Sequence, residues 1–151
     1  MTWHKITSQE DIDELMDVFH SFTGSVLTEM SYTSGAFVMP SLLMYPVNAK
    51  RRVRMIFQRQ DKDVPAIEIV FDEMNRFNLS PASTNSTAVM DDVYFKKHDD
   101  SIYWANTGAF YIDRIDAFET STHVTWLRAK KAQWRIIKDH WGDNQIYAAI
   151  K

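Results

Sequence analysis

The chain of 151 residues contains no cysteine, which excludes disulfide bonds, thiolate nucleophiles and every metal site built from cysteine. Its four glycines are too scattered to cradle a phosphate, and it has no phosphate loop, dinucleotide fingerprint or nucleophile elbow. The apolar runs are only a few residues long, so we expect no membrane span, and the first residues do not have the pattern of a signal peptide. These absences argue against the common nucleotide-dependent enzymes and predict a cytoplasmic protein.

The length and composition are those of one soluble globular domain, which we expect to cover residues 1–151. Apolar residues make up 45% and charged residues 25% of the chain, enough to build a core without disulfides or metals. The formal net charge is −3, which argues against general nucleic-acid binding.

A helix is predicted near the amino terminus. Thr7 or Ser8 can cap its first turn, and Glu10 or Asp11 can complete a capping box. Apolar residues then recur at helical spacing, and we expect the helix to end at Thr23-Gly24; the stripe consists of Ile12, Leu15, Met16, Phe19 and Phe22.

The rest of the chain has the period of two that is typical of strands. A strand is predicted over 25–33, an irregular segment over 36–49, and a β-hairpin over 51–72. We expect a loop over 75–86 with a strand extension near Phe77, and a strand over 87–97 that turns at 98–100 into a strand over 101–106. One helical turn near 113–116 and a hairpin of 122–128 with 133–138 complete the prediction, before a tail over 145–151. The fold class is therefore α+β, with the amino-terminal helix packed on a curved antiparallel sheet.

No set of residues identifies a catalytic site. His98, Asp99 and Asp100 could offer three metal ligands, but aspartate is common in turns, so we expect a hairpin tip, no metal and no cofactor. His20 stands near the end of the helix, where capping explains it better than catalysis. Asp91 is placed on the inward face of its strand if Val89, Val93 and Phe95 face the core, which makes it the candidate acid.

The hairpin over 51–72 sets basic residues against acidic ones. Arg52 and Arg54 alternate with apolar residues on its first strand, and Glu68 and Asp72 lie on the polar face of the second. We interpret them as cross-strand pairs that set the register. Phosphate binding by the basic strand is the alternative. Because tryptophan and arginine dominate protein interfaces, we select Arg52, Arg54, Arg59, Gln60, Trp104 and Trp126 as candidate binding residues.

Several segments resemble a family of small uncharacterised bacterial proteins. They are VFH (18–20), EMSYTSG (29–35), RMIFQRQ (54–60), IEIVF (67–71) and IYW (102–104). The family pattern has aspartate after the histidine, where this chain has Ser21. The resemblance implies no activity, and the size and strand content are similar to those of immunity proteins in bacterial toxin systems.

We therefore expect a protein that acts by binding another protein, with toxin neutralisation as one form of that role. Two alternatives stay open. One is a small-ligand-binding protein or enzyme with a pocket between helix and sheet, using Asp91, His123 or Tyr103; the other is RNA binding through residues 50–60. The oligomeric state is open between a monomer and a dimer paired through an edge strand.

Overall fold

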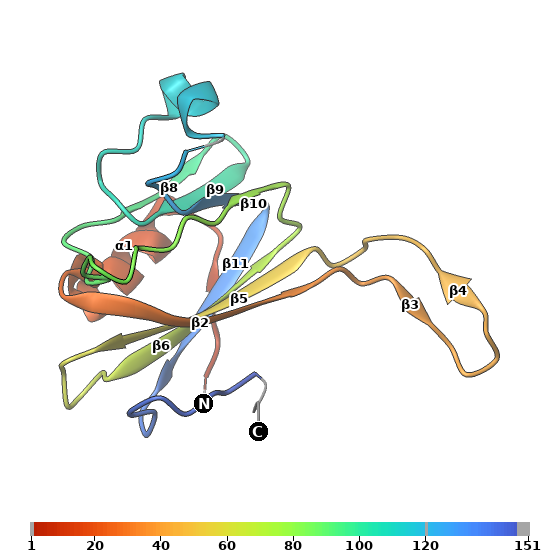
Figure 1. Cartoon of the computed structure of the whole chain (residues 1–151), viewed down its shortest axis with the longest axis horizontal. Helices are drawn as coiled ribbons and strands as arrows, with labels where there is room; N and C mark the ends of the chain where they lie inside the picture. The colour runs from red at the N-terminus through yellow and green to blue at the C-terminus, as the bar shows by residue number, and fades with distance from the viewer. Residues whose placement is uncertain (1, 120, 148–151) are drawn as a thin grey trace.

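The structure is a computed structural model that describes residues 2–119 and 121–147. It confirms the α+β class with antiparallel sheets and is dominated by strands (Figure 1). The helical elements are α1 (Gln9–Val18), η1 (His20–Phe22) and η2 (Ile112–Phe118). The strands are β1 (His4–Ile6), β2 (Ser25–Thr33), β3 (Phe37–Val38), β4 (Met44–Tyr45), β5 (Arg52–Arg59), β6 (Ala66–Asp72), β7 (Arg76–Asn78), β8 (Tyr94–His98), β9 (Ser101–Ala105), β10 (Trp126–Ala129) and β11 (Lys131–Ile137).

The strands form two main sheets where the sequence predicts one. The first has the order β1-β11-β6-β5-β2 and the second β7-β10-β9-β8. The predicted hairpin over 51–72 is confirmed as β5 and β6, with Arg54 opposite Val70 and Ile56 opposite Glu68. β3 and β4 pair only with each other, in a small ribbon that continues β2 and β5 away from both sheets.

The predicted hairpin between 122–128 and 133–138 is wrong, because β10 and β11 belong to different sheets. β10 pairs with β7 and β9, whereas β11 pairs with β1 and β6. The buried positions shift phase at Lys130 and Lys131, two consecutive exposed residues that separate buried Ala129 from buried Ala132. The chain therefore bends from one sheet into the other instead of folding back.

The amino-terminal helix begins as predicted. Ser8 is the N-cap of α1, its hydroxyl accepts from the backbone N–H of Asp11, and the Asp11 carboxylate accepts from the N–H of Ser8. The α-helix ends at Val18, earlier than predicted, and the chain continues as η1. In η1 the residues His20, Ser21 and Phe22 all have positive φ angles. The side chains of Phe22 and of Phe19, which precedes this turn, are both buried.

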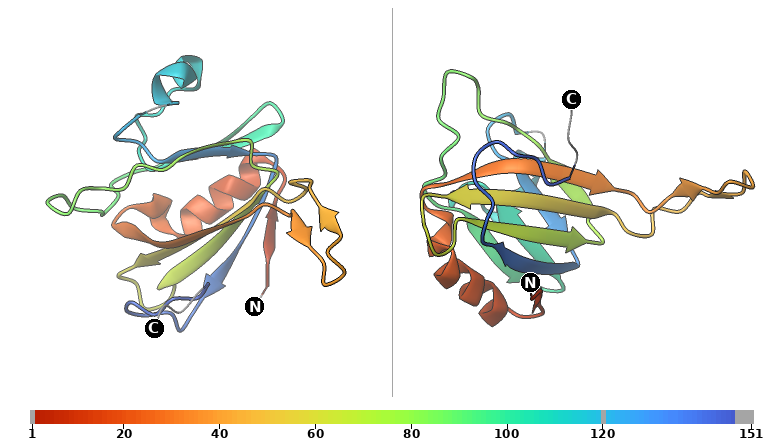
Figure 2. Two further views of the ribbon diagram at one scale, coloured as in Figure 1. Left: turned by 45° about the vertical axis from the view of Figure 1, so that its right-hand side comes forward. Right: turned by 90° about the horizontal axis from the view of Figure 1, so that it is seen from below.

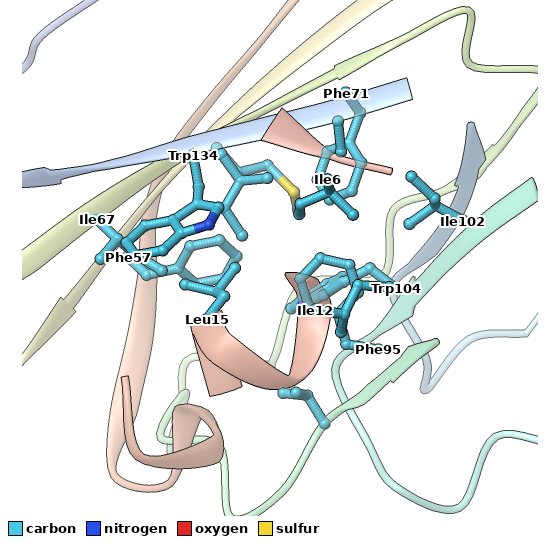
Figure 3. Packing of buried hydrophobic residues seen from close by; sticks show 14 of the residues in the cluster. Ile6, Ile12, Leu15, Phe57, Ile67, Phe71, Phe95, Ile102, Trp104 and Trp134 are labelled. Carbon is cyan, nitrogen blue, oxygen red and sulfur yellow. The ribbon is translucent and has the colours of Figure 1, made fainter. Parts of the chain in front are cut away.

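Apolar side chains of α1 and of both sheets form one buried cluster, shown in part in Figure 3. Its members include Ile12 and Leu15 from α1, Phe57 and Trp134 from the first sheet, and Trp104 from the second. A second cluster around Phe110 and Trp126 lies beneath η2, which confirms a helical turn in that region. Figure 2 shows α1 between the two layers of strands.

The segment before β8 differs from the predicted strand over 87–97. Only Tyr94–His98 is a strand, and Met90 makes a single bridge to Ser25. Val89 is exposed while Met90 and Val93 are buried, so the alternation on which the prediction rests is absent. Of the predicted tail over 145–151, residues 148–151 lie outside the described residues.

Candidate interaction surface

Residues 34–49 form an arm that projects beyond the end of β2 and β5 (Figure 1). Phe37 pairs with Tyr45 and Val38 with Met44, and the rings of Phe37 and Tyr45 stack with their centroids 5.3 Å apart. The arm closes at its base because the carbonyl of Ser34 accepts from the backbone N–H groups of Lys50 and Arg51, both at 3.0 Å. The prediction that 36–49 is irregular is therefore wrong at β3 and β4.

Gly35 is required at the base of the arm. Its φ is +96°, and a Cβ atom there would lie 2.6 Å from the backbone nitrogen of Lys50. A side chain would therefore be strained and would also push apart the two strands of the arm.

The arm exposes large apolar side chains to solvent. Eight of them are 42–83% exposed: Phe37, Val38, Met39, Leu42, Leu43, Met44, Tyr45 and Val47. Residues 34–49 include no charged residue. Contiguous exposed apolar surface of this kind marks a site of interaction with another molecule. The signal is present in the sequence, as an uncharged apolar segment that joins two adjacent antiparallel strands, although its pattern predicts only an irregular segment.

An open groove lies between β2, the segment over 79–92 and the ends of β9 and β10. Its volume is about 860 Å³. Leu27 and Met30 of β2 line it, together with Leu79 and Val89, whose side chains are more than two-fifths exposed. Of the three residues predicted for a ligand pocket, Asp91 and His123 line this groove and Tyr103 does not. The groove is beside β2, whereas the sequence-based alternative placed a pocket between helix and sheet.

Asp91 is exposed at the groove, so its predicted place on the inward face is wrong. The neighbouring Met90 and Val93 enter the core, and the two aspartates between them are left outside. Gly108 lies against Asp92 so closely that a Cβ atom would collide with the carboxylate. The acids on the groove are Asp91, Asp92 and Glu29, and Glu29 accepts from the backbone N–H groups of Ile146 and Tyr147.

Two of the predicted binding residues are paired within the molecule. Arg52 donates to both carboxylate oxygens of Asp72, at 2.7 and 3.2 Å. Arg54 donates twice to Oε2 of Glu68, at 3.1 and 3.0 Å. Both arginines are partly buried and lie on one face of the first sheet. The cross-strand interpretation of the hairpin is therefore confirmed.

The carboxylate of Glu68 is fully buried, although the sequence indicated a charged outer face. Arg135 donates to its Oε1 at 2.7 Å, and the Tyr147 hydroxyl donates to its Oε2 at 2.9 Å. The segment after β11 crosses this face of the sheet, as Figure 2 shows, and Gln58 donates to the carbonyls of His140 and Gly142. Burial and the adjacent carboxylate of Glu68 raise the pKa of the Tyr147 phenol above its ordinary value.

Arg59 and Gln60 lie at the turn end of the hairpin. Arg59 donates to the carbonyl of Thr23 at 2.9 Å and to Asp61 at 3.4 Å, while Gln60 is exposed. Nε2 of His20 lies 3.3 Å from Oδ2 of Asp61. Hydrogen bonds from the backbone N–H groups of Asp63 and Val64 lower the pKa of Asp61. These contacts connect η1 and Thr23 to the hairpin turn.

Trp104 and Trp126 are both buried, and Trp104 also borders the groove. The indole N–H of Trp126 donates to the carbonyl of Phe118 at 2.7 Å. Trp104 packs against Phe22 and Phe57, and its indole nitrogen has no hydrogen-bond partner within residues 2–119 and 121–147. These two aromatic residues therefore belong to the core. A single sequence does not distinguish aromatic residues of the core from those of an interface.

Among the described residues, no group of three histidines, aspartates or glutamates could hold a metal ion. His98 and Asp99 approach within 3.6 Å, but Asp100 pairs with Lys130 instead. No helix in the described part of the chain is long and apolar enough to cross a membrane.

Comparison of the chain with protein-family models, curated proteins and solved structures finds no match in any of the three. The resemblance to a bacterial family therefore stays a prediction from the sequence.

Proposed function

We propose that this protein acts by binding another polypeptide, without chemistry of its own, and that the arm over 34–49 makes the contact. The observation that carries the proposal is the exposure of eight large apolar side chains on an uncharged projection. Covering them would remove roughly 100 Å² each, or about 800 Å² in all, which is one partner's share of a standard protein interface.

The test is site-specific photo-crosslinking in cells. A photoreactive amino acid at Leu42, on the arm, is expected to give a discrete protein adduct that mass spectrometry identifies. The same amino acid at Glu14, an exposed position on α1, is the matched control. Equal adduct patterns at both positions would overturn the proposal.

The specific form that the sequence suggests is a cytoplasmic immunity protein that neutralises a bacterial toxin. What supports this form is the resemblance of size and strand content. An adjacent toxin gene, and an adduct between Leu42 and that toxin, are the expected findings. If Leu42 gives an adduct only with an unrelated protein, the role in toxin neutralisation is wrong and the role in protein binding stands.

Small-ligand binding is the second candidate, and the groove is the observation that favours it. Its volume of about 860 Å³ is within the range of ligand sites. RNA binding loses its support, because Arg52 and Arg54 already donate to Asp72 and Glu68.

A further inference from the structure

We propose that the partner of the arm is a second copy of this chain, and that each arm lies along β2 and in the groove of the other copy. This inference rests on the proposed function and names its partner. The result is a two-fold dimer in which both arms are exchanged.

The arm and the groove both present apolar side chains, although polar side chains also line the groove. The arm presents leucine, methionine, valine and aromatic side chains, and the groove presents Leu27, Met30, Leu79 and Val89. Because the arm has no charge, none of its residues opposes the carboxylates of Asp91 and Asp92 at the groove.

The arm leaves the end of β2 and projects away from the groove, so it does not reach the groove of its own copy. Figures 1 and 2 show the arm leaving the carboxyl end of β2, while the 79–92 segment lies near the start of that strand. The bridge between Ser25 and Met90 places this segment beside the start of β2.

β2 is the last strand of its sheet, so its outer edge can pair with a strand of the other copy in the same way in both copies. Beyond the bridge at Ser25, no described strand pairs with its second side, so its backbone groups can accept another strand. If the arm of one copy pairs antiparallel with β2 of the other copy, the arm runs from the end of that strand toward its start. The nine residues from Ser34 to Leu42 span roughly 30 Å when extended, about the length of β2 itself, so the arm tip reaches Val89 of the partner copy.

The first test measures the dimer of the purified chain by sedimentation velocity across the micromolar range. The wild type is expected to dimerise. Leu42→Ser with Leu43→Ser on the arm, and separately Leu79→Ser with Val89→Ser on the groove, are each expected to weaken dimerisation at least about tenfold, the effect of losing an interface anchor. Tyr111→Ser, which removes an exposed aromatic outside both surfaces, is the matched control and is expected to change nothing.

The second test uses the absence of native cysteine. One copy carries Leu43→Cys and another carries Val89→Cys, and mild oxidation of the mixture is expected to give a disulfide between the two. A copy with Glu14→Cys replaces the Val89→Cys copy as the control, and it is expected to give none above background.

A monomeric wild type, a dimer unaffected by both pairs of serine variants, or cross-linking equal to the Glu14→Cys control overturns the inference. Adhesion of the arm to phosphatidylglycerol vesicles by a monomeric chain overturns it as well. The purified chain could be monomeric while Leu42 still gives an adduct with a different protein in cells. In that case the inference that the partner is a second copy is wrong, and the proposed binding function stands. If Leu42 gives no adduct and the chain is monomeric, both fail.

Discussion

Glu68 places a carboxylate inside the molecule and surrounds it with donors. Two arginines from neighbouring strands and one tyrosine from the final segment donate to its two oxygens. Charges removed from water need such partners, because the loss of hydration is otherwise not offset. The arrangement joins β5, β6, β11 and the segment after β11 at one point.

Glu68→Ala is expected to lower the free energy of unfolding by about 3–5 kcal/mol, because Arg54 and Arg135 then remain partly buried without their carboxylate. The measurement is urea unfolding at neutral pH. Glu73→Ala is the control: Glu73 pairs with Lys131 at the surface, and its removal should cost about 0–1 kcal/mol. Equal losses of unfolding free energy in the two variants would show that the buried cluster stabilises the fold no more than a surface ion pair does.

The raised pKa of the Tyr147 phenol predicts that the stability of the fold decreases at alkaline pH. The pKa of its phenol is raised in the folded protein, so the unfolded chain loses this proton near pH 10 while the folded chain retains it. Stability from this group is complete below about pH 10 and falls as the pH rises further, by at most about 1.4 kcal/mol per pH unit and less for a partly exposed phenol.

The measurement is the free energy of unfolding of the wild type and Tyr147→Phe between pH 8 and about 11. The wild type should lose stability more steeply above pH 10, whereas below pH 9 the difference between the two should be constant. Parallel curves across the whole range would contradict the assignment.

At the scale of elements, the two strand bends decide the topology. The chain passes from β6 to β7 through residues 73–75 and from β10 to β11 through Lys130, and both passages connect the same two sheets. They lie together, because the N–H of Asn75 donates to the carbonyl of Arg128 and the N–H of Lys130 donates to the carbonyl of Asp72. Two strands therefore cross between the sheets as one bent ribbon.

Helix α1 depends on its N-cap. Ser8→Ala removes the acceptor for the N–H of Asp11 and is expected to lower the free energy of unfolding by about 0.5–2 kcal/mol, as measured by thermal and urea unfolding. Ser8→Thr keeps a hydroxyl and should retain most of the stability. If the threonine variant is as unstable as the alanine variant, the hydroxyl is not the cause.

At the scale of the whole molecule, the arm is separate from the part that holds the fold together. None of the buried core residues lies between 34 and 50. Large exposed apolar surface of this kind marks interaction sites, which is the basis of the proposed binding role.

Replacing residues 36–48 with a short glycine–asparagine turn is expected to change the free energy of unfolding of the isolated chain by less than about 1 kcal/mol, since exposed side chains contribute little to folding. The same change should abolish dimerisation. The measurement is urea unfolding at a concentration where the wild type is monomeric. A loss comparable to that of a core substitution would mean that the arm stabilises its own copy.

Much of the secondary structure could be predicted because its signals are local. The strand over 25–33, the hairpin of β5 and β6 and the cap at Ser8 all match the structure. The predictions are wrong where local patterns are ambiguous. Consecutive lysines at 130–131 are compatible with either a turn or a bend between sheets, and Val89 fits the alternation of a strand although the strand begins only at Tyr94.

The sequence by itself determined where the amino-terminal helix is capped, which charges pair across the hairpin, and which catalytic motifs are absent. These depend on neighbours along the chain or on composition alone. Only the tertiary structure decided that Glu68 is covered, that Trp104 and Trp126 are core, and that the 34–49 arm is open to solvent. Burial depends on segments far apart in the chain, such as Tyr147 over Glu68, and no local pattern records which segment will cover which face.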